Sequence, residues 1–396
     1  MWFLVVYPVT MSIFWIIGSI FHQFKSNRNI QLDSSEKIAL FIPCYNEEET
    51  INTVINEVLK YGDLLHEIII IDNGSSDATW SKINALTNLD LRIHILQTDG
   101  NTGKANALNV ALDYTNSDYI VCIDADALIE KNTIKNLVGF FKNSPNLGAV
   151  TGNPRVKNTY NMLAKLQLIE YASTIGLIKR AQRFMGRVMT VSGVAVAFRR
   201  KALVEVGGWS ENIITEDIDV TWKLYRSKWD IDYNPDALVY IFVPEKVILL
   251  LKQRKRWSRG GFEVVRKNLW FTISNKSPLF FLLLDSILCA FWTILFFGEL
   301  LFSVFQQKSL LALLIWFSIS GFFLTFLNVL QILVSLYFDK KYIKNIYRLL
   351  YLIPIFSLFY WILQYVATLP SLPYLFRKIN KDKATWDSPD RGKDMS

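Results

Sequence analysis

Two carboxylates separated by a single residue, Asp124 and Asp126, come at the end of the apolar run YIVCI. Carboxylates with this spacing at the end of a strand project from the same side and can share one divalent cation. Their hard oxygen atoms suit Mg²⁺ or Mn²⁺, and these ions in turn suit a diphosphate. A D-x-D pair also occurs by chance in solvated turns, so its position after a buried strand is what favours a metal site. Asp72 ends a second apolar run, EIIIID, where a carboxylate is usually either solvated or bound to something.

An acidic cluster occurs later in the chain, in the segment ITEDIDV (213–219) at the start of a predicted helix over 220–225. Helix capping by Thr215, together with the helix dipole, accounts well for one acid at this place. It accounts poorly for three, which are Glu216, Asp217 and Asp219. The cluster is therefore a second candidate for chemistry.

The basic and aromatic segment KQRKRWSRGG (252–261) precedes an apolar block. One interpretation is an interfacial helix that binds anionic lipid headgroups. Nucleic-acid binding is disfavoured, because these residues are juxtamembrane and the chain has no groove-reading module.

Other chemistries lack their sequence signals. Neither GxGxxG nor GxxxxGK[ST] occurs, so nicotinamide and P-loop functions would have no phosphate cradle. The three cysteines are scattered, without C-x-x-C or paired-His spacing. This disfavours a disulfide framework and a zinc site, and it indicates a reducing compartment for the soluble part.

The candidate residues fall between alternating apolar runs. Four short runs are typical of buried parallel strands: 37–43, 67–72, 92–96 and 119–124. Helical spacing occurs over 47–61 and 106–113. This order predicts an α/β fold with a doubly wound, mostly parallel sheet, whose ligands bind at the carboxyl ends of strands. Asp72, Asp124 and Asp126 are expected at those ends.

Hydrophobic residues make up 51% of the 396 residues, and the formal net charge is +8. Residues 1–21 carry no charge, are long enough to cross a bilayer, and lack the basic start and cleavage site of a signal peptide. Three more apolar blocks follow, at 278–305, 310–338 and 349–376. Lys25 and Arg28, then the basic cluster over 340–348, place the soluble part in the cytoplasm by the positive-inside rule.

The basic residues after position 376 conflict with that topology, because one span before the soluble part and three after it leave the C-terminus outside. Either the tail is outside despite its charge, or one block lies in the interface or re-enters the membrane. The resulting domain boundaries are a transmembrane helix at 1–22, a cytoplasmic catalytic domain at 30–245, interfacial helices at 246–277, a transmembrane region at 278–376 and a basic tail at 377–396.

In combination, these segments resemble the processive family-2 glycosyltransferases along their whole length. The matching pieces, in the family's order, are PCYNEEETI (43–51), IDNGSSDAT (71–79), GKANALN (103–109), DAD (124–126), TED (215–217) and QRKRW (253–257). Within this family, the chain looks most like the bacterial polymerases of β-1,6-linked N-acetylglucosamine. That narrower resemblance is carried by AVTGNPR (149–155), GLIKRAQ (176–182), VSGVAVAFRR (191–200), ITEDIDVTWKL (213–224) and W-x-SPDRG (386–392).

The resemblance implies a glycosyltransferase-A fold embedded in a helical membrane protein, and a role for each matching residue. The residues implied to bind the nucleotide and donor are Pro43, Tyr45, Glu47, Asp72, Lys104 and Asp124. Asp126 would coordinate Mg²⁺ or Mn²⁺, and Asp217 would be the general base. Those implied to contact the acceptor and diphosphate are Glu216, Gln253, Arg256 and Trp257. Relatives usually have Asp-Asp or Asn-Asp where this chain has Asp72-Asn73, so either of these two residues could contact the nucleotide.

The implied activity is inverting, processive polymerisation of N-acetylglucosamine from UDP-N-acetylglucosamine, with extrusion of the polysaccharide for biofilm formation. The implied location is the bacterial cell membrane, in contact with lipids and a small two-span accessory subunit. Three alternatives remain: a chitin-type or hyaluronan-type synthase, a membrane-anchored enzyme that transfers a single sugar, and a non-catalytic scaffold.

Overall fold

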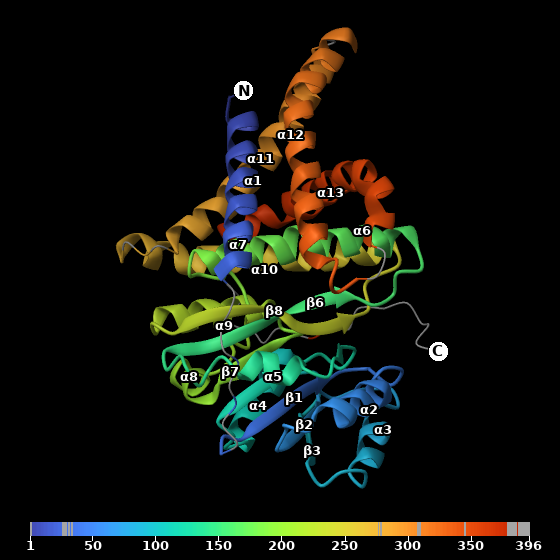
Figure 1. The fold of residues 1–396 in the computed structure, drawn as a ribbon, viewed down its shortest axis with the longest axis vertical. Helices are drawn as coiled ribbons and strands as arrows, with labels where there is room; N and C mark the ends of the chain where they lie inside the picture. The colour runs from blue at the N-terminus through green and yellow to red at the C-terminus, as the bar shows by residue number, and fades with distance from the viewer. Residues whose placement is uncertain are drawn as a thin grey trace. The chain divides into compact units, whose positions relative to one another are not determined.

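The computed structural model describes residues 2–25, 30, 32, 35–275, 277, 279–306, 310–343, 346–377 and 386. The chain divides into two compact units. A helical unit contains residues 1–25, 165–185 and 250–377, and a sheet unit contains residues 26–164, 186–249 and 378–396. Figure 1 traces both along the chain.

One half of the sheet is parallel and has the order β3-β2-β1-β4. Its strands are β1 (Ile38–Cys44), β2 (Glu67–Asp72), β3 (Ile93–Gln97) and β4 (Tyr119–Cys122). The helices between them are α2 (Ile51–Tyr61), α3 (Thr79–Leu86) and α4 (Lys104–Tyr114). Cys44 pairs with Asp72 in the register of β1 and β2, so the carboxyl ends of these strands coincide. The predicted doubly wound half is confirmed.

The other half continues as β4-β7-β6-β8-β5. Its strands are β5 (Leu128–Ile129), β6 (Leu147–Val156), β7 (Val196–Arg199) and β8 (Asp230–Ile241). β7 runs antiparallel to both β4 and β6, whereas β6 and β8 are parallel. The helices of this part are α5 (Thr133–Val138), α8 (Arg200–Glu205) and α9 (Glu216–Arg226). The sheet is therefore mixed but mostly parallel.

The core of the sheet unit is formed where the central strands are covered on both faces. Every residue of β1 and β4 is buried, as are Ile68 to Asp72 of β2. Strands buried on both sides read as continuous apolar runs rather than as alternating ones. This explains why the sequence predicted these strands closely.

In the part of the helical unit that the structure describes, there are seven α-helices or parts of them and three segments of other helix types. The α-helices are α1 (Trp2–Lys25), α6 (Met162–Glu170), α7 (Leu177–Phe184), α10 (Val247–Ser274), α11 (Phe280–Phe305), α12 (Leu310–Asp339) and α13 (Ile353–Thr368). The π-helix η1 (Tyr171–Gly176) joins α6 to α7, and the 3₁₀ segments η2 (Ile346–Leu352) and η3 (Leu369–Leu375) flank α13. Among the described residues, three helical segments are long and apolar enough to cross a membrane: Trp2–Phe24, Phe280–Ser303 and Ile346–Leu375.

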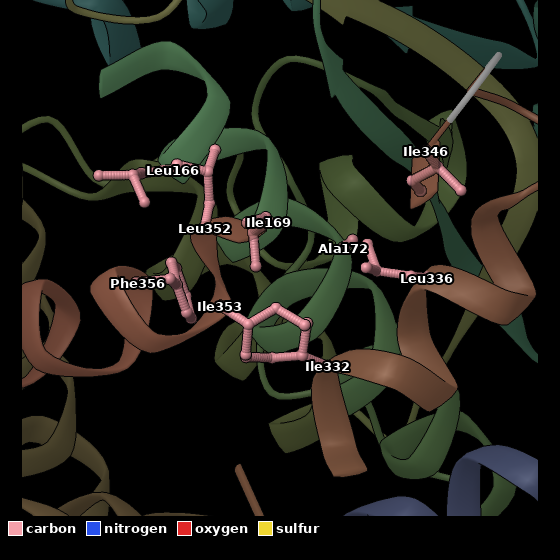
Figure 2. Packing of buried hydrophobic residues seen from close by; sticks show 9 residues of the cluster. All are labelled: Leu166, Ile169, Ala172, Ile332, Leu336, Ile346, Leu352, Ile353 and Phe356. Atoms are coloured by element: carbon pink, nitrogen blue, oxygen red, sulfur yellow. The ribbon is translucent and has the colours of Figure 1, made fainter. Parts of the chain in front are cut away.

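Two apolar clusters hold the helical unit together. The larger one, shown in Figure 2, comprises Leu166, Ile169, Ala172, Ile332, Leu336, Ile346, Leu352, Ile353 and Phe356. The smaller one packs α1 against α11 and includes a hydrogen bond of 2.8 Å from Trp292 Nε1 to the Leu4 carbonyl. The Tyr7 hydroxyl donates to Asp285 Oδ1 at 2.8 Å, so this acidic residue within an apolar block is satisfied by a side chain of α1.

The chain crosses between the two units more often than the expected boundaries indicate. The sequence placed residues 30–245 in one domain, whereas residues 165–185 belong to the helical unit in the structure. Most of the expected basic tail at 377–396 lies outside the described residues. Arg377 and Trp386 are described.

Candidate active site

Two adjacent side chains at the carboxyl end of β2, Asp72 and Asn73, are fully buried. The Asp72 carboxylate accepts hydrogen bonds from the Ser75 backbone N–H and from Gln97 Nε2, the latter at 3.1 Å. Asn73 Oδ1 accepts from the hydroxyls of Thr98 and Thr102, both at 3.0 Å. Both side chains are therefore fixed within the sheet unit, and which of them would touch a nucleotide stays a prediction.

The residues after β1 lie next to this pair. Asn46 adopts the left-handed conformation with φ of 55°, and its Oδ1 accepts the Ser76 backbone N–H at 2.8 Å. The backbone N–H of Glu47 donates to Thr79 Oγ1. The buried carboxylate of Glu47 accepts a hydrogen bond of 2.9 Å from the Thr50 hydroxyl. These bonds tie the segment after β1 to the segment after β2. Three residues implied to bind the nucleotide, Pro43, Tyr45 and Glu47, stand in this part of the sheet edge.

Two residues without a sequence-based role join the set. Asn101 forms reciprocal bonds with the backbone of Trp386: its Nδ2 donates to the carbonyl at 2.8 Å, and its Oδ1 accepts the N–H at 3.0 Å. The Trp386 ring lies 6.2 Å from the ring of Tyr45, centroid to centroid. The W-x-SPDRG motif (386–392) is a sequence signal for Trp386, whereas no motif contains Asn101.

Lys104 connects two of the acidic motifs. It is the first residue of α4, and its Nζ lies 2.5 Å from Asp124 Oδ1 and 3.4 Å from Glu216 Oε1. Burial alone would lower the pKa of Lys104, but the charges of Asp124 and Glu216 outweigh it and raise that pKa. Lys104 is therefore a fixed positive charge. Burial raises the pKa of Glu216, although Lys104 acts in the opposite direction.

Asp217 lies beside this ion-pair cluster, in the first turn of α9. Its Oδ2 accepts the Gly193 backbone N–H at 3.3 Å, and its Oδ1 accepts the Ile218 N–H at 2.8 Å. A small pocket is lined by residues that include Lys104, Cys122, Gly193, Glu216 and Asp217. The structure thus brings together residues from α4, the end of β4, the segment before β7 and α9.

Gly193 lies against both Lys104 and Asp217, and it has no side chain of its own. A Cβ at this position would lie 3.3 Å from Lys104 Nζ and 3.5 Å from the Asp217 Cβ. We expect Gly193→Ala to lower turnover about tenfold, because small displacements of reacting groups have large effects on rate. Steady-state assays of sugar transfer, with the melting temperature as a check on folding, measure this.

The matched control is Gly298→Ala, since a Cβ at Gly298 meets no heavy atom within 4 Å. Equal activities for the two variants would show that the contacts of Gly193 do not position Lys104 and Asp217.

The donor set after β4 fits a divalent cation only when a ligand supplies the remaining oxygens. Asp126 is buried, and the Asp124 side chain is 16% exposed and already faces Lys104. Among the described residues, no group of three or more His, Cys, Asp or Glu side chains could hold a metal by itself. Mg²⁺ is commonly bound through one or two carboxylates plus substrate phosphates, and Asp124 and Asp126 match that pattern.

The remaining implied residues, Gln253, Arg256 and Trp257, lie on α10 in the helical unit. Gln253 Oε1 accepts a hydrogen bond of 2.8 Å from Arg254 Nη1, and Arg256 and Trp257 are both partly exposed. Their roles toward acceptor and diphosphate stay predictions.

Comparison with known proteins places the chain in a sequence family and identifies relatives along its whole length. The sequence model of the family described as "Glycosyltransferase like family 2" matches residues 36–260. Poly-beta-1,6-N-acetyl-D-glucosamine synthase of Staphylococcus epidermidis is 39% identical over 406 residues, which cover 98% of each chain. The synthase of the same name from Staphylococcus aureus strain COL is 39% identical over 405 residues, again with 98% of each chain covered.

A solved structure shares the fold at low sequence identity. The mannosyltransferase PcManGT from Pyrobaculum calidifontis, in complex with GDP-Man and Mn²⁺, superposes with a TM-score of 0.60. It is 17% identical, and the superposition covers 94% of this chain and 98% of the other. Together with the mixed, mostly parallel sheet, this confirms the expected glycosyltransferase-A fold.

Proposed function

Because this chain belongs to the family-2 glycosyltransferases, we propose that it polymerises N-acetylglucosamine from UDP-N-acetylglucosamine into a β-1,6-linked chain. The observation that carries the proposal is the 39% identity to two poly-β-1,6-N-acetylglucosamine synthases over nearly the whole of each protein. The carboxylates Asp124, Asp126 and Asp217 are all present, which favours an active enzyme over a scaffold.

The nucleotide would bind at the carboxyl ends of β1 and β2. Uracil and ribose would contact Pro43, Tyr45, Glu47 and Asp72. The hydrogen bonds that fix Glu47 and Asp72 support this, because a preorganised site loses less freedom on binding. Lys104 carries a fixed positive charge and would be drawn to the donor's diphosphate.

Lys104 and Asp124 would contact the nucleotide, and Asp126 would coordinate Mg²⁺ or Mn²⁺ against its diphosphate. A divalent cation, when bound, neutralises the negative charge that develops on the leaving nucleotide. The charge of Asp124 is balanced by Lys104 in the present arrangement. Arg256 and Gln253 would contact the same diphosphate from α10.

Asp217 would remove the proton from the acceptor hydroxyl as the bond to the sugar forms. A hydroxyl is a poor nucleophile, and a correctly placed base accelerates such steps by roughly 10²–10⁴-fold. The bonds from Gly193 and Ile218 hold the Asp217 carboxylate in one orientation. A single in-line displacement inverts the anomeric carbon, so an α-linked donor gives a β-glycoside and needs no covalent enzyme intermediate.

The helical unit would carry the product across the bacterial cell membrane. A polysaccharide cannot cross hydrocarbon unaided, because its hydroxyls would lose their hydrogen bonds. Aromatic residues such as Trp257 would stack against sugars along the exit path, and a small two-span accessory subunit would widen a thin channel. The basic residues near the spans support a catalytic unit on the cytoplasmic side, with helices in contact with lipid.

The linkage of the product is the experiment that tests this proposal. Membranes that contain the protein and its accessory subunit are supplied with labelled UDP-N-acetylglucosamine, and the polymer is treated with periodate. A 1,6-linked residue keeps neighbouring hydroxyls on carbons 3 and 4, so we expect periodate to be consumed along the whole polymer as it opens each ring between these two carbons.

A 1,4-linked polymer has no such pair of hydroxyls and resists periodate. A resistant product would move the protein to the chitin type, and a strict need for UDP-glucuronate would move it to the hyaluronan type. A labelled product that carries one sugar only would indicate single transfer.

A further inference from the structure

A buried ion pair in the helical unit has no part in the chemistry described above. Glu170 Oε2 and Arg254 Nη2 lie 2.6 Å apart, and the two side chains are 6% and 3% exposed. Burying two charges is unfavourable unless they pair well, and such pairs can often be replaced by apolar residues without loss of stability. A contribution to folding stability is therefore a weak explanation for the presence of this ion pair.

The Arg254 guanidinium also contacts two residues of the QRKRW segment. Its Nη1 donates to Gln253 Oε1 at 2.8 Å. Its central carbon lies over the Trp257 ring, 4.1 Å from the ring centroid. Residues three apart share one face of a helix, which allows Arg254 to stack on Trp257. One planar group therefore orients Gln253 and Trp257 while Glu170 fixes its own position.

Glu170 is itself held in place. It is the last residue of α6, and the π-helix η1 begins directly after it. The Ser173 hydroxyl donates to the Ile169 carbonyl at 2.7 Å, and Gln331 Nε2 donates to the Ser173 carbonyl at 3.3 Å. π-helical turns are rare and are frequently found at functional sites. The Glu170 carboxylate thus lies at the junction of α6 and η1, and Gln331 of α12 bonds to the turn that follows it.

We propose that Glu170 and Arg254 are positioning residues that hold Trp257 and Gln253 in the orientation that retains the growing glycan between successive transfers. The inference rests on the proposed function, in which Trp257 and Gln253 contact the acceptor. The Arg254 plane steadies the indole, and the partly exposed Trp257 ring keeps surface on which a sugar can stack. Losing this support increases release of the glycan and shortens the product.

The test removes the pair without leaving one charge buried alone. In the double variant Glu170→Met/Arg254→Met, the full-length protein in membranes is supplied with UDP-N-acetylglucosamine, and polymer length and kinetic constants are measured. We expect the mean length to fall about fivefold to tenfold, given the usual strength of a cation–π contact, while the KM for the donor stays unchanged. Arg254→Lys keeps the charge but loses the planar stack, so it is expected to shorten the product as well.

A second buried pair in the same unit provides the matched control. Arg180 Nη2 lies 3.0 Å from Asp339 Oδ1, with side chains 1% and 0% exposed. We expect Arg180→Met/Asp339→Met to make product of ordinary length. The proposal is overturned if the Glu170 and Arg254 variants make full-length polymer, or if the control shortens the product equally. Failure of the wild type to make any polymer from this donor would instead contradict the proposed function.

Discussion

The Asp217→Asn variant will bind UDP-N-acetylglucosamine but make less than about a tenth of the wild-type polymer, because it cannot accept the acceptor's proton. Asparagine has nearly the shape of aspartate, and its Oδ1 can still accept one of the two backbone N–H groups that hold Asp217. Polymer formed per minute and the Kd for UDP separate loss of catalysis from loss of binding.

Asp230→Asn is the matched control for this substitution. Asp230 is an exposed carboxylate that pairs with Arg187 at 3.0 Å, and exposed pairs contribute little. We expect its polymer yield to equal that of the wild type. Synthesis by Asp217→Asn at more than about a tenth of the normal rate would show that another group is the base.

The second large effect concerns the divalent cation. We expect Asp126→Asn to abolish synthesis, and excess chelator to stop the wild-type enzyme reversibly, because the diphosphate must be neutralised as it leaves. Asp124→Asn should also abolish synthesis, and it additionally removes the partner that lies 2.5 Å from Lys104. Initial rates before and after chelation, followed by addition of Mg²⁺ or Mn²⁺, measure the effect.

Measurement of UDP binding with and without Mn²⁺ shows whether Asp124 and Asp126 act in metal binding or have a purely structural role. The wild type should bind UDP more tightly with the ion, and Asp126→Asn should lose that difference while its melting temperature is retained. Full activity in excess chelator, with no metal found in the protein, would contradict the metal site.

The parallel half of the sheet could be predicted because its strands are buried on both faces. The run at 67–72 coincides with β2, and the run at 37–43 differs from β1 by one residue at each end. β6 and β8 were not predicted. β6 contains Gly148, Gly152 and Pro154, and β8 is interrupted by Pro235 between the alternating residues 230–233 and the short apolar run 237–241, and glycine and proline argue against a strand.

The helical segment over 165–185 lies inside the expected 30–245 domain and belongs to the helical unit, a grouping that the sequence did not indicate. It carries Lys179 and Arg180, charges that ordinarily indicate solvent, yet both side chains are buried. Arg180 is stabilised there by Asp339, which is 159 positions away in the chain. A single sequence read locally does not reveal such a partner.

In the candidate site too, the sequence indicates single residues from their local pattern but not the contacts between residues that are distant in the chain. Each acidic motif could be found locally, as a carboxylate at a strand end or at a helix start. The sequence did not reveal that Lys104 pairs with both Asp124 and Glu216, or that Gly193 approaches Asp217. These contacts depend on how β4, α4 and α9 meet in the fold.

Polymer formation from UDP-N-acetylglucosamine alone is the property that defines the proposed activity. Its most direct test supplies membranes with one labelled sugar nucleotide at a time and measures label in high-molecular-weight product together with UDP released, using Asp217→Asn membranes as the background. We predict labelled polymer from UDP-N-acetylglucosamine as sole donor, with one UDP released for each sugar incorporated. Polymer that forms only when a second sugar nucleotide is added, or UDP release without any polymer, would contradict the proposed activity.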